Sequence, residues 1–126
     1  MTANKPNTGE SHNSVPYDID ELVTAIQNDR RRLVLLFADE FATPISAGDL
    51  AEAIAVLENG QNKSELNAQD RKRVYISLTQ CHLDTLDDLG AVVYDDRSKQ
   101  IWPTGATPTL VSVIRHLQLT SMTDGY

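Results

Sequence analysis

The spacing of apolar residues changes at Gly90, and this change limits the folds available to the chain. Up to Leu89 the apolar residues recur every three or four positions, the spacing of amphipathic helices. Directly after Gly90, residues 91–94 have the pattern of a short strand, and residues 100–102 can pair back with it across a turn at 95–98. The sequence therefore predicts helices followed by a β-hairpin.

Polar caps and helix-stopping residues divide the helical part into segments. Asp18 begins the first helix, with Glu21 three residues later completing a capping box. Thr43-Pro44 stops the second helix, and Gly90 stops the fourth. The expected helices cover residues 19–27, about 30–40 after the Asn28-Asp29 cap, a third from Ser46, a fourth from Asn67 to Leu89, and a last one from Thr107 with Pro108 at its first position.

The apolar residues of these helices predict which faces are buried. The third helix is expected to bury Leu50, Ile54 and Leu57. The fourth carries one stripe of four apolar residues and an adjacent stripe of two. These are Val74, Leu78, Leu86 and Leu89 on the first, and Ile76 and Leu83 on the second.

The chain is long enough for one domain, which we expect at residues 17–119, between a disordered tail at 1–16 and a frayed end at 120–126. Its longest apolar run, Leu33 to Phe37, is far short of the roughly 20 residues needed to span a membrane. No signal segment opens the chain, so we expect a cytoplasmic protein. The one cysteine, Cys81, excludes an intramolecular disulfide framework and a multi-cysteine zinc site.

The predicted order of elements is that of a winged helix-turn-helix, a mostly α fold with a small β-hairpin. One feature departs from a compact helix-turn-helix: about ten residues separate the third and fourth helices, where three or four are usual. Either the fourth helix begins with a separate short turn near residues 68–75, or the fold is a variant.

The stretch from Arg71-Lys72-Arg73 to Tyr94-Asp95 resembles the recognition helix and wing of winged helix-turn-helix regulators. In those regulators, leucines lie four and seven residues before the glycine that ends the helix, as Leu86 and Leu83 do here. The wider pattern, with Asp29-Arg30-Arg31-Arg32 and His82-Leu83, resembles small haloarchaeal winged-helix domains of uncharacterised function. The resemblance covers roughly residues 18–102 and implies a DNA-binding regulator of transcription.

A helix that reads the major groove needs cations near its amino end and exposed polar side chains at the bases. We expect Arg71, Lys72 and Arg73 to contact phosphates, Ser77, Thr79 and Gln80 to contact bases, and Arg97 and Lys99 to act in the wing. The alternative is that these cations form a solvated face that balances the acidic residues.

Acidic residues argue against DNA contact along the whole helix. Asp84, Asp87 and Asp88 lie in its carboxyl half, and Asp95 and Asp96 lie in the wing. They must point away from phosphates, or the helix does not dock along its length. The alternative function is therefore a winged-helix module that binds proteins and whose acidic face meets a basic partner.

The charge balance indicates the conditions in which the chain works. Eighteen acidic residues against eleven basic ones give a net charge of −7, and Asp outnumbers Glu twelve to six. Short carboxylates hold water and keep a chain soluble in concentrated salt, so the composition favours a halophilic source. An ordinary acidic cytosolic protein would look similar.

Arg30, Arg31 and Arg32 begin a helix, where their charge opposes the helix dipole. They can pair with Asp18, Asp20 or Glu21, or they can hold a DNA phosphate. We expect the structural role.

The last helix has apolar residues on more than one face, which favours a homodimer on a two-fold DNA site. The expected dimer interface comprises Leu110, Val111, Val113, Ile114 and Leu117, of which Leu110, Ile114 and Leu117 form a stripe that can also serve the core.

Catalysis finds little support, because the sequence has no phosphate-binding glycine motif, HExxH or nucleophile elbow. Cys81, His82 and Asp84 do not converge on one ion, because adjacent helical residues point about 100° apart. We expect Cys81 in the core and His82 as a partly buried polar group, with no metal and no cofactor. A ligand- or redox-sensing role of Cys81 is a third, weaker alternative.

Overall fold

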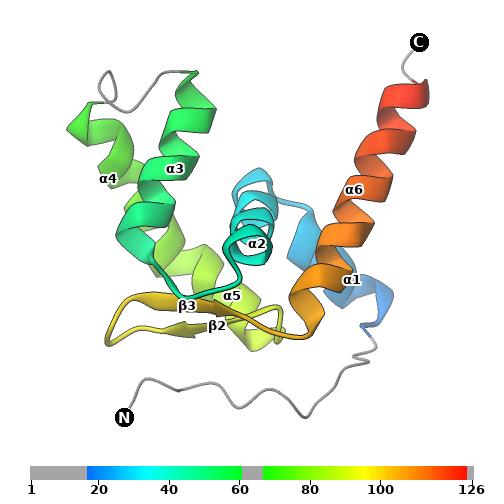
Figure 1. Cartoon of the computed structure of the whole chain (residues 1–126), viewed down its shortest axis with the longest axis horizontal. Coiled ribbons are helices and arrows are strands. Elements are labelled where there is room, and N and C mark those ends of the chain that lie inside the picture. The colour runs from blue at the N-terminus through cyan, green and yellow to red at the C-terminus, as the bar shows by residue number, and fades with distance from the viewer. Residues whose placement is uncertain (1–16, 61–66, 125–126) are drawn as a thin grey trace.

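The computed structural model describes residues 17–60 and 67–124, and the side chains as far as Leu119. Figure 1 shows α2 at the centre, with α3 and α4 on one side, α1 and α6 on the other, and the sheet across one end. The elements are, in order, α1 (Ile19–Ile26), α2 (Asp29–Phe41), β1 (Ile45–Ser46), α3 (Ala47–Asn59), α4 (Ala68–Ser77), a π-helical turn (Leu78–His82), α5 (Leu83–Asp88), β2 (Val92–Asp95), β3 (Gln100–Pro103) and α6 (Ala106–Asp124).

The first four helices begin at the expected polar caps. Asp18 accepts a hydrogen bond from the backbone N–H of Glu21 at 2.8 Å, and the Glu21 side chain accepts one from Asp18 N–H at 3.1 Å. The side chains of Asn28, Ser46 and Asn67 likewise accept backbone N–H groups of α2, α3 and α4. These bonds satisfy donors that the first turn of a helix leaves unpaired, so the starts were predictable from sequence.

The long helical region that was expected from Asn67 to Leu89 contains a π-helical turn at Leu78–His82, which was not expected. Its cause lies in the core: Leu78 and Leu83 are both fully buried, yet they are five residues apart. An α-helix brings residues three or four apart onto one face, whereas the i→i+5 bonds of a π turn align residues five apart. The backbone N–H of Leu83 accordingly donates to the carbonyl of Leu78.

The expected hairpin forms, and a third short strand joins it. β2 and β3 pair antiparallel, and β1 pairs with the other edge of β3, which gives the strand order β1-β3-β2. Ile101 of β3 lies opposite Ile45 on one side and Tyr94 on the other. The structure thus confirms a mostly helical fold with a small antiparallel sheet, and its element order is consistent with a winged helix whose wing is the β2–β3 turn.

The core lies where α2, α3, the π turn, α5, β3 and α6 meet. Two expectations about burial are wrong, those for Leu57 and Cys81, and one residue of the second apolar stripe of the fourth helix is also exposed. Leu57, expected on the buried face of α3, is 57% exposed, because α3 buries Ala51 and Ala55 beside Leu50 and Ile54. Ile76 is 41% exposed. Cys81, expected in the core, is exposed on the π turn.

The last helix begins one residue before the expected Thr107 and continues to Asp124, beyond the expected end at Leu119. Pro108 is therefore its third residue and still lies in the first turn, where its missing N–H has no helical partner. None of the helices in the described ranges is both long and apolar enough to cross a membrane. The tail expected at residues 1–16 lies outside the described residues, and so does the part at 61–66 of the polar loop that was expected from Glu58 to Leu66 between the third and fourth helices.

Candidate functional site

The amino-terminal half of α4 borders a shallow groove of about 360 Å³ against α3. Arg71, Lys72 and Tyr75 line it from α4, and the small side chains of Ala51 and Ala68 leave the space open. Arg71 and Tyr75 lie four residues apart and so share one face of the helix. The cations expected at the start of the recognition segment therefore border one groove with an aromatic ring.

The wing is fastened to the start of α3 by its last turn residue. Lys99 has φ +58°, an unusual conformation for a residue with a Cβ. Its backbone N–H donates to Asp95 O at 2.7 Å, and its carbonyl accepts the N–H of Ala47 at 2.8 Å. The position of the wing is thus set by backbone bonds to the hairpin and to α3.

One of the two expected wing cations, Lys99, is paired with a carboxylate of the wing. Lys99 Nζ donates to Asp96 Oδ1 at 2.8 Å; this bond lowers the pKa of Asp96 and raises the pKa of Lys99. Tyr94 donates its hydroxyl to the same carboxylate at 3.2 Å, and burial raises the pKa of Tyr94 to about 12. Lys99 is therefore bound within the wing.

Some of the residues expected to contact phosphates or to act in the wing already pair with a carboxylate, and the others do not. Arg73 Nη1 lies 3.8 Å from Asp70 Oδ1, and Lys99 is paired with Asp96. Arg71, Lys72 and Arg97 form no ion pair with any residue in the described ranges. These three cations are the ones available to an external anion.

The three expected base-contacting residues differ in exposure. Gln80 is exposed on the π turn, whereas Ser77 and Thr79 are half-buried. The hydroxyl of Thr79 donates to Tyr75 O at 2.9 Å, so its proton is already used within the helix. Gln80 is therefore the only one of the three that is both exposed and free of a described hydrogen bond.

Two residues of this surface were not predicted, Tyr75 and Ile76. Tyr75 lies close enough to the wing to contribute, after the Asp96 hydrogen bond, to the raised pKa of Lys99. Ile76 is exposed one turn after Lys72. The spacing of four that links Arg71 to Tyr75 and Lys72 to Ile76 was the signal that could have identified both.

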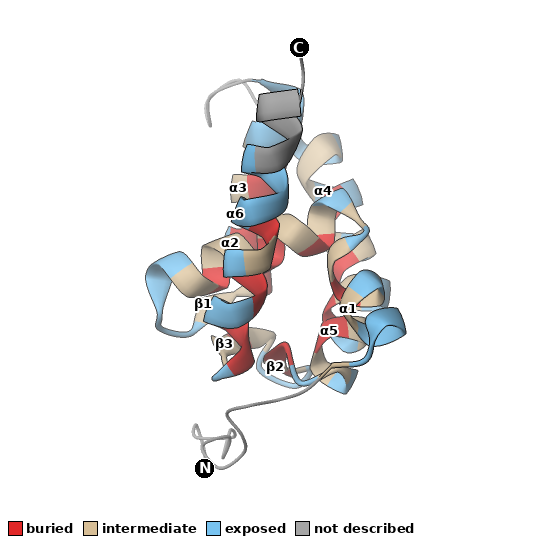
Figure 2. Ribbon diagram, turned by 90° about the vertical axis from the view of Figure 1, so that its right-hand side faces the viewer, coloured by how far each residue is buried: buried red, intermediate tan, exposed pale blue. Residues whose placement is uncertain are grey.

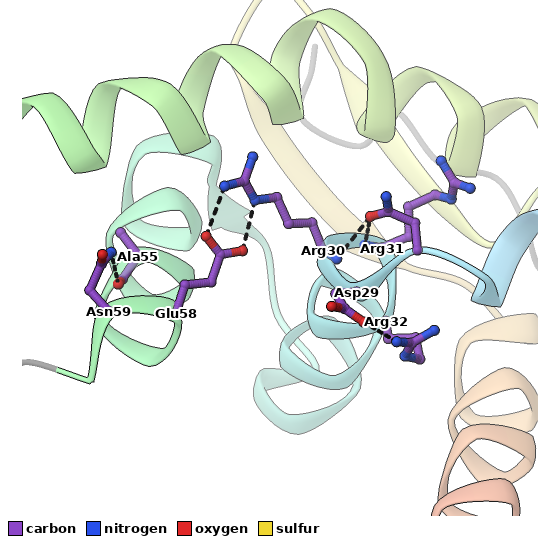
Figure 3. A network of polar contacts seen from close by, with 8 residues as sticks. Asp29, Arg30, Arg31, Arg32, Ala55, Glu58 and Asn59 are labelled. Carbon is purple, nitrogen blue, oxygen red and sulfur yellow. Dashed lines mark hydrogen bonds and ion pairs between the residues drawn. The ribbon is translucent and has the colours of Figure 1, made fainter.

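The arginines that begin α2 have structural partners, as expected, but none of the expected ones (Figure 3). Arg30 forms two hydrogen bonds to Glu58 of α3, at 2.7 and 2.8 Å, which raise the pKa of Arg30. Arg32 pairs with Asp29. Asp18, Asp20 and Glu21 of α1 are not their partners.

Arg31 is the most buried charged residue in the described part of the chain, with 8% exposure. Its Nη1 lies 3.2 Å from His82 Nδ1 on the π turn, and its Nε has no hydrogen-bond partner. Burial, together with the charges of Arg31 and Arg30, lowers the pKa of His82. The contact joins the central helix to the π turn and favours a neutral His82.

The expected dimer residues are mostly unavailable to a second chain. Leu110, Val111 and Ile114 are at most 3% exposed and lie in the core of this chain. Val113 is half-buried, and Leu117 is 51% exposed. Only the last two can therefore meet another subunit.

The fold and this surface define a small, mostly helical protein with a three-stranded antiparallel sheet. The chain belongs to a family described as a domain of unknown function, DUF7344, which matches residues 23–102. That span contains the arginines of α2, all of α4 and the wing, and α6 follows it. No curated protein and no solved structure matches the chain.

Proposed function

We propose that the chain binds double-stranded DNA through α4 and the wing, and that it is a sequence-specific transcriptional regulator acting as a homodimer. One observation carries the proposal: Arg71, Lys72 and Arg97 make no ion pair with a described residue, although the chain has a net charge of −7. In so acidic a protein, unpaired cations on neighbouring elements suit an external anion. The DNA backbone supplies anions at regular spacing.

The exposed side chains of the same segment suit contacts with bases. A glutamine such as Gln80 can bond adenine in the major groove, and an apolar side chain such as Ile76 can contact the methyl group of thymine. Arg73 and Lys99, which already have carboxylate partners, are assigned a smaller share of the affinity. Ser77 and Thr79 are assigned at most a supporting role, because both are half-buried.

The acidic carboxyl half of the recognition segment limits how it docks. Asp84 and Asp88 are exposed on α5, where they would repel phosphates. We therefore assign the groove contact to α4 and the π turn, with α5 directed away from the duplex. The helix would enter by its amino-terminal half.

The acidic composition suits a cytoplasm of high salt, which also accords with the resemblance to haloarchaeal winged-helix domains. Counterion release contributes less to affinity as bulk salt rises. A regulator in such a cell would depend more on direct base contacts and on two linked half-sites.

The test is selection of binding sites from a randomised pool of DNA duplexes, followed by titration of the selected duplex. Lys72→Gln removes one proposed phosphate contact in each protomer, and we expect it to weaken binding about tenfold. Gln27→Glu, at the residue that caps the carboxyl end of α1, is the matched control, because it makes the same change in net charge away from α4 and the wing. We expect the control to bind within about twofold of the wild type.

Failure to enrich any sequence, or equal weakening by both variants, would contradict DNA binding through α4. A protein partner recovered from the source cell and released by removing exposed acidic residues would then support the interaction module.

A further inference from the structure

The outer half of α6 is a helical ridge whose described side chains are all exposed. The helix buries Ala106, Leu110, Val111 and Ile114 near its start. From Arg115 to Leu119 every side chain is exposed, and Figure 2 shows pale blue along this part of α6. Leu117 is 51% exposed. Short helical segments are only marginally stable in water without packing, so a covering surface is expected.

A hollow of about 680 Å³ lies beside this ridge. The carboxyl-terminal ends of α3 and α6 project from the sheet on either side of α2 (Figure 1), and residues of all three helices line the hollow. Leu33 and Leu36 contribute from α2, Leu57 from α3 and Gln118 from α6. Leu57 is 57% exposed there. Ridge and hollow thus adjoin, and both carry half-exposed leucines.

The charges around the hollow cancel. Arg30 is paired with Glu58 at 2.7 Å and Arg32 with Asp29, so these four groups add no net charge. The whole chain, by contrast, carries −7. Two copies of an acidic protein repel each other at most faces, and this neutral face is one where they can approach closely. A basic partner would instead favour an acidic surface.

We propose that a second copy of this chain occupies the hollow. In a two-fold arrangement, the outer half of α6 of each protomer lies in the hollow of the other, and Leu117 contacts Leu57. A ridge beside a hollow is self-complementary, which is the requirement for a closed two-fold interface. This surface replaces the expected one, since Leu110, Val111 and Ile114 stay in the core. It specifies the dimer of the proposed function and does not depend on DNA binding.

The first test is sedimentation of the full chain without DNA, at low and at high salt. We expect a dimer for the wild type and at least a tenfold weaker dimer for Leu57→Glu and for Leu117→Glu. Both residues are more than half exposed in the protomer, so the variants should keep the wild-type circular dichroism spectrum. Ile76→Glu is the control, because it adds the same charge at an exposed apolar residue of α4 and should remain dimeric.

The second test identifies the contact itself. In a Cys81→Ser background, Leu57→Cys and Leu117→Cys chains are prepared separately, mixed and oxidised. We expect the mixture to form a covalent dimer faster than either variant alone, because only the mixture places the two cysteines at one contact.

A monomeric wild type, dimers unaffected by both leucine variants, or no preferential cross-link in the mixture would overturn the proposal. Loss of DNA binding by Ile76→Glu with its dimer intact would concern the proposed function alone.

Discussion

At the scale of single residues, the contact between Arg31 and His82 is the least ordinary interaction in the molecule. A buried guanidinium normally faces a carboxylate, whereas Arg31 faces an imidazole nitrogen at 3.2 Å. This nitrogen can accept a hydrogen bond only while it is unprotonated. The carboxylates that border the same hollow, Asp29 and Glu58, are already paired with Arg32 and Arg30.

We therefore expect His82 to make stability depend on pH. Its native pKa is lowered from 6.5, so the unfolded state binds the proton more readily. The stabilising contribution is complete above pH 6.5 and is lost as the pH falls through the native pKa. We expect the free energy of unfolding, measured with denaturant, to fall less between pH 8 and pH 5 in His82→Gln than in the wild type. The side-chain carbonyl of this glutamine can still accept a hydrogen bond from Arg31.

The matched control is Ser112→Gln, which places the same side chain at an exposed position of α6 that does not titrate. It should reproduce the pH profile of the wild type. Parallel profiles for the wild type and His82→Gln would contradict the role given to His82.

Thr107 is a buried polar residue whose hydroxyl forms two hydrogen bonds with backbone groups. Its hydroxyl donates to Ala91 O at 2.7 Å and accepts from Thr104 N–H at 2.8 Å, which ties α6 to the sheet. Thr107→Val keeps the shape and removes both bonds. We expect it to lower the free energy of unfolding by about 1–3 kcal/mol in chemical denaturation. Thr109→Val, on an exposed position of the same helix, should change it by less than about 0.5 kcal/mol.

At the scale of elements, local signals explain what the sequence could predict. The helix starts at Asp18, Asn28, Ser46 and Asn67 follow from side chains that bond their own first turn. The hairpin follows from alternation around a polar turn. Both kinds of signal lie within a few neighbouring residues, so no knowledge of the fold is needed.

The features that were missed depend on distant residues. β1 exists because Ile45 pairs with Ile101, which is far away in the sequence. Leu57 was assigned to the buried face by its spacing of three from Ile54, but the neighbouring helices cover the alanine side of α3 instead. At the candidate site, the cations were predictable from their run in α4. The pairing of Arg73 with Asp70 and of Lys99 with Asp96 is local, three residues apart in each case. It was missed because a spacing of three permits an ion pair without requiring one.

The π turn leads to a prediction about the spacing of the core leucines on either side of it. Deleting the exposed Gln80 would place Leu78 and the next core leucine four residues apart, which an ordinary α-helix satisfies. We expect this variant to fold with its free energy of unfolding within about 1 kcal/mol of the wild type. Inserting one alanine at the same point makes the spacing six. It should cost about 2–5 kcal/mol by removing a leucine from the core.

Thermal and denaturant unfolding of the two variants would measure the contrast. Equal destabilisation by the deletion and by the insertion would mean that the π turn is required for the fold itself. Greater tolerance of the deletion, with DNA binding weaker than that of Gln80→Ala, would mean that the turn serves to position α4 for DNA binding.

At the scale of the whole molecule, net charge and local charge act in opposite directions. The chain carries −7, which repels DNA at distances that depend on salt. The proposed function, by contrast, gives each protomer three phosphate contacts, through Arg71, Lys72 and Arg97. Each contact contributes about −0.9 to the slope of log affinity against log salt. Three contacts per protomer predict a slope of about −3 for one half-site and about −5 for a dimer.

Leu117→Glu, which we expect to be monomeric, separates binding to one half-site from binding by the dimer. Leu117→Glu lies far in sequence from α4 and the wing and leaves Arg71, Lys72 and Arg97 in place. The slope for this variant should therefore fall to about half that of the wild type on the same selected duplex. Binding titrations at several salt concentrations give both slopes directly. A wild-type slope near −3 that is unchanged in Leu117→Glu would mean that a single protomer contacts the DNA even when the protein is dimeric. The arrangement of both binding surfaces on one duplex would then be wrong, because a two-fold dimer that spans two half-sites uses both sets of cations.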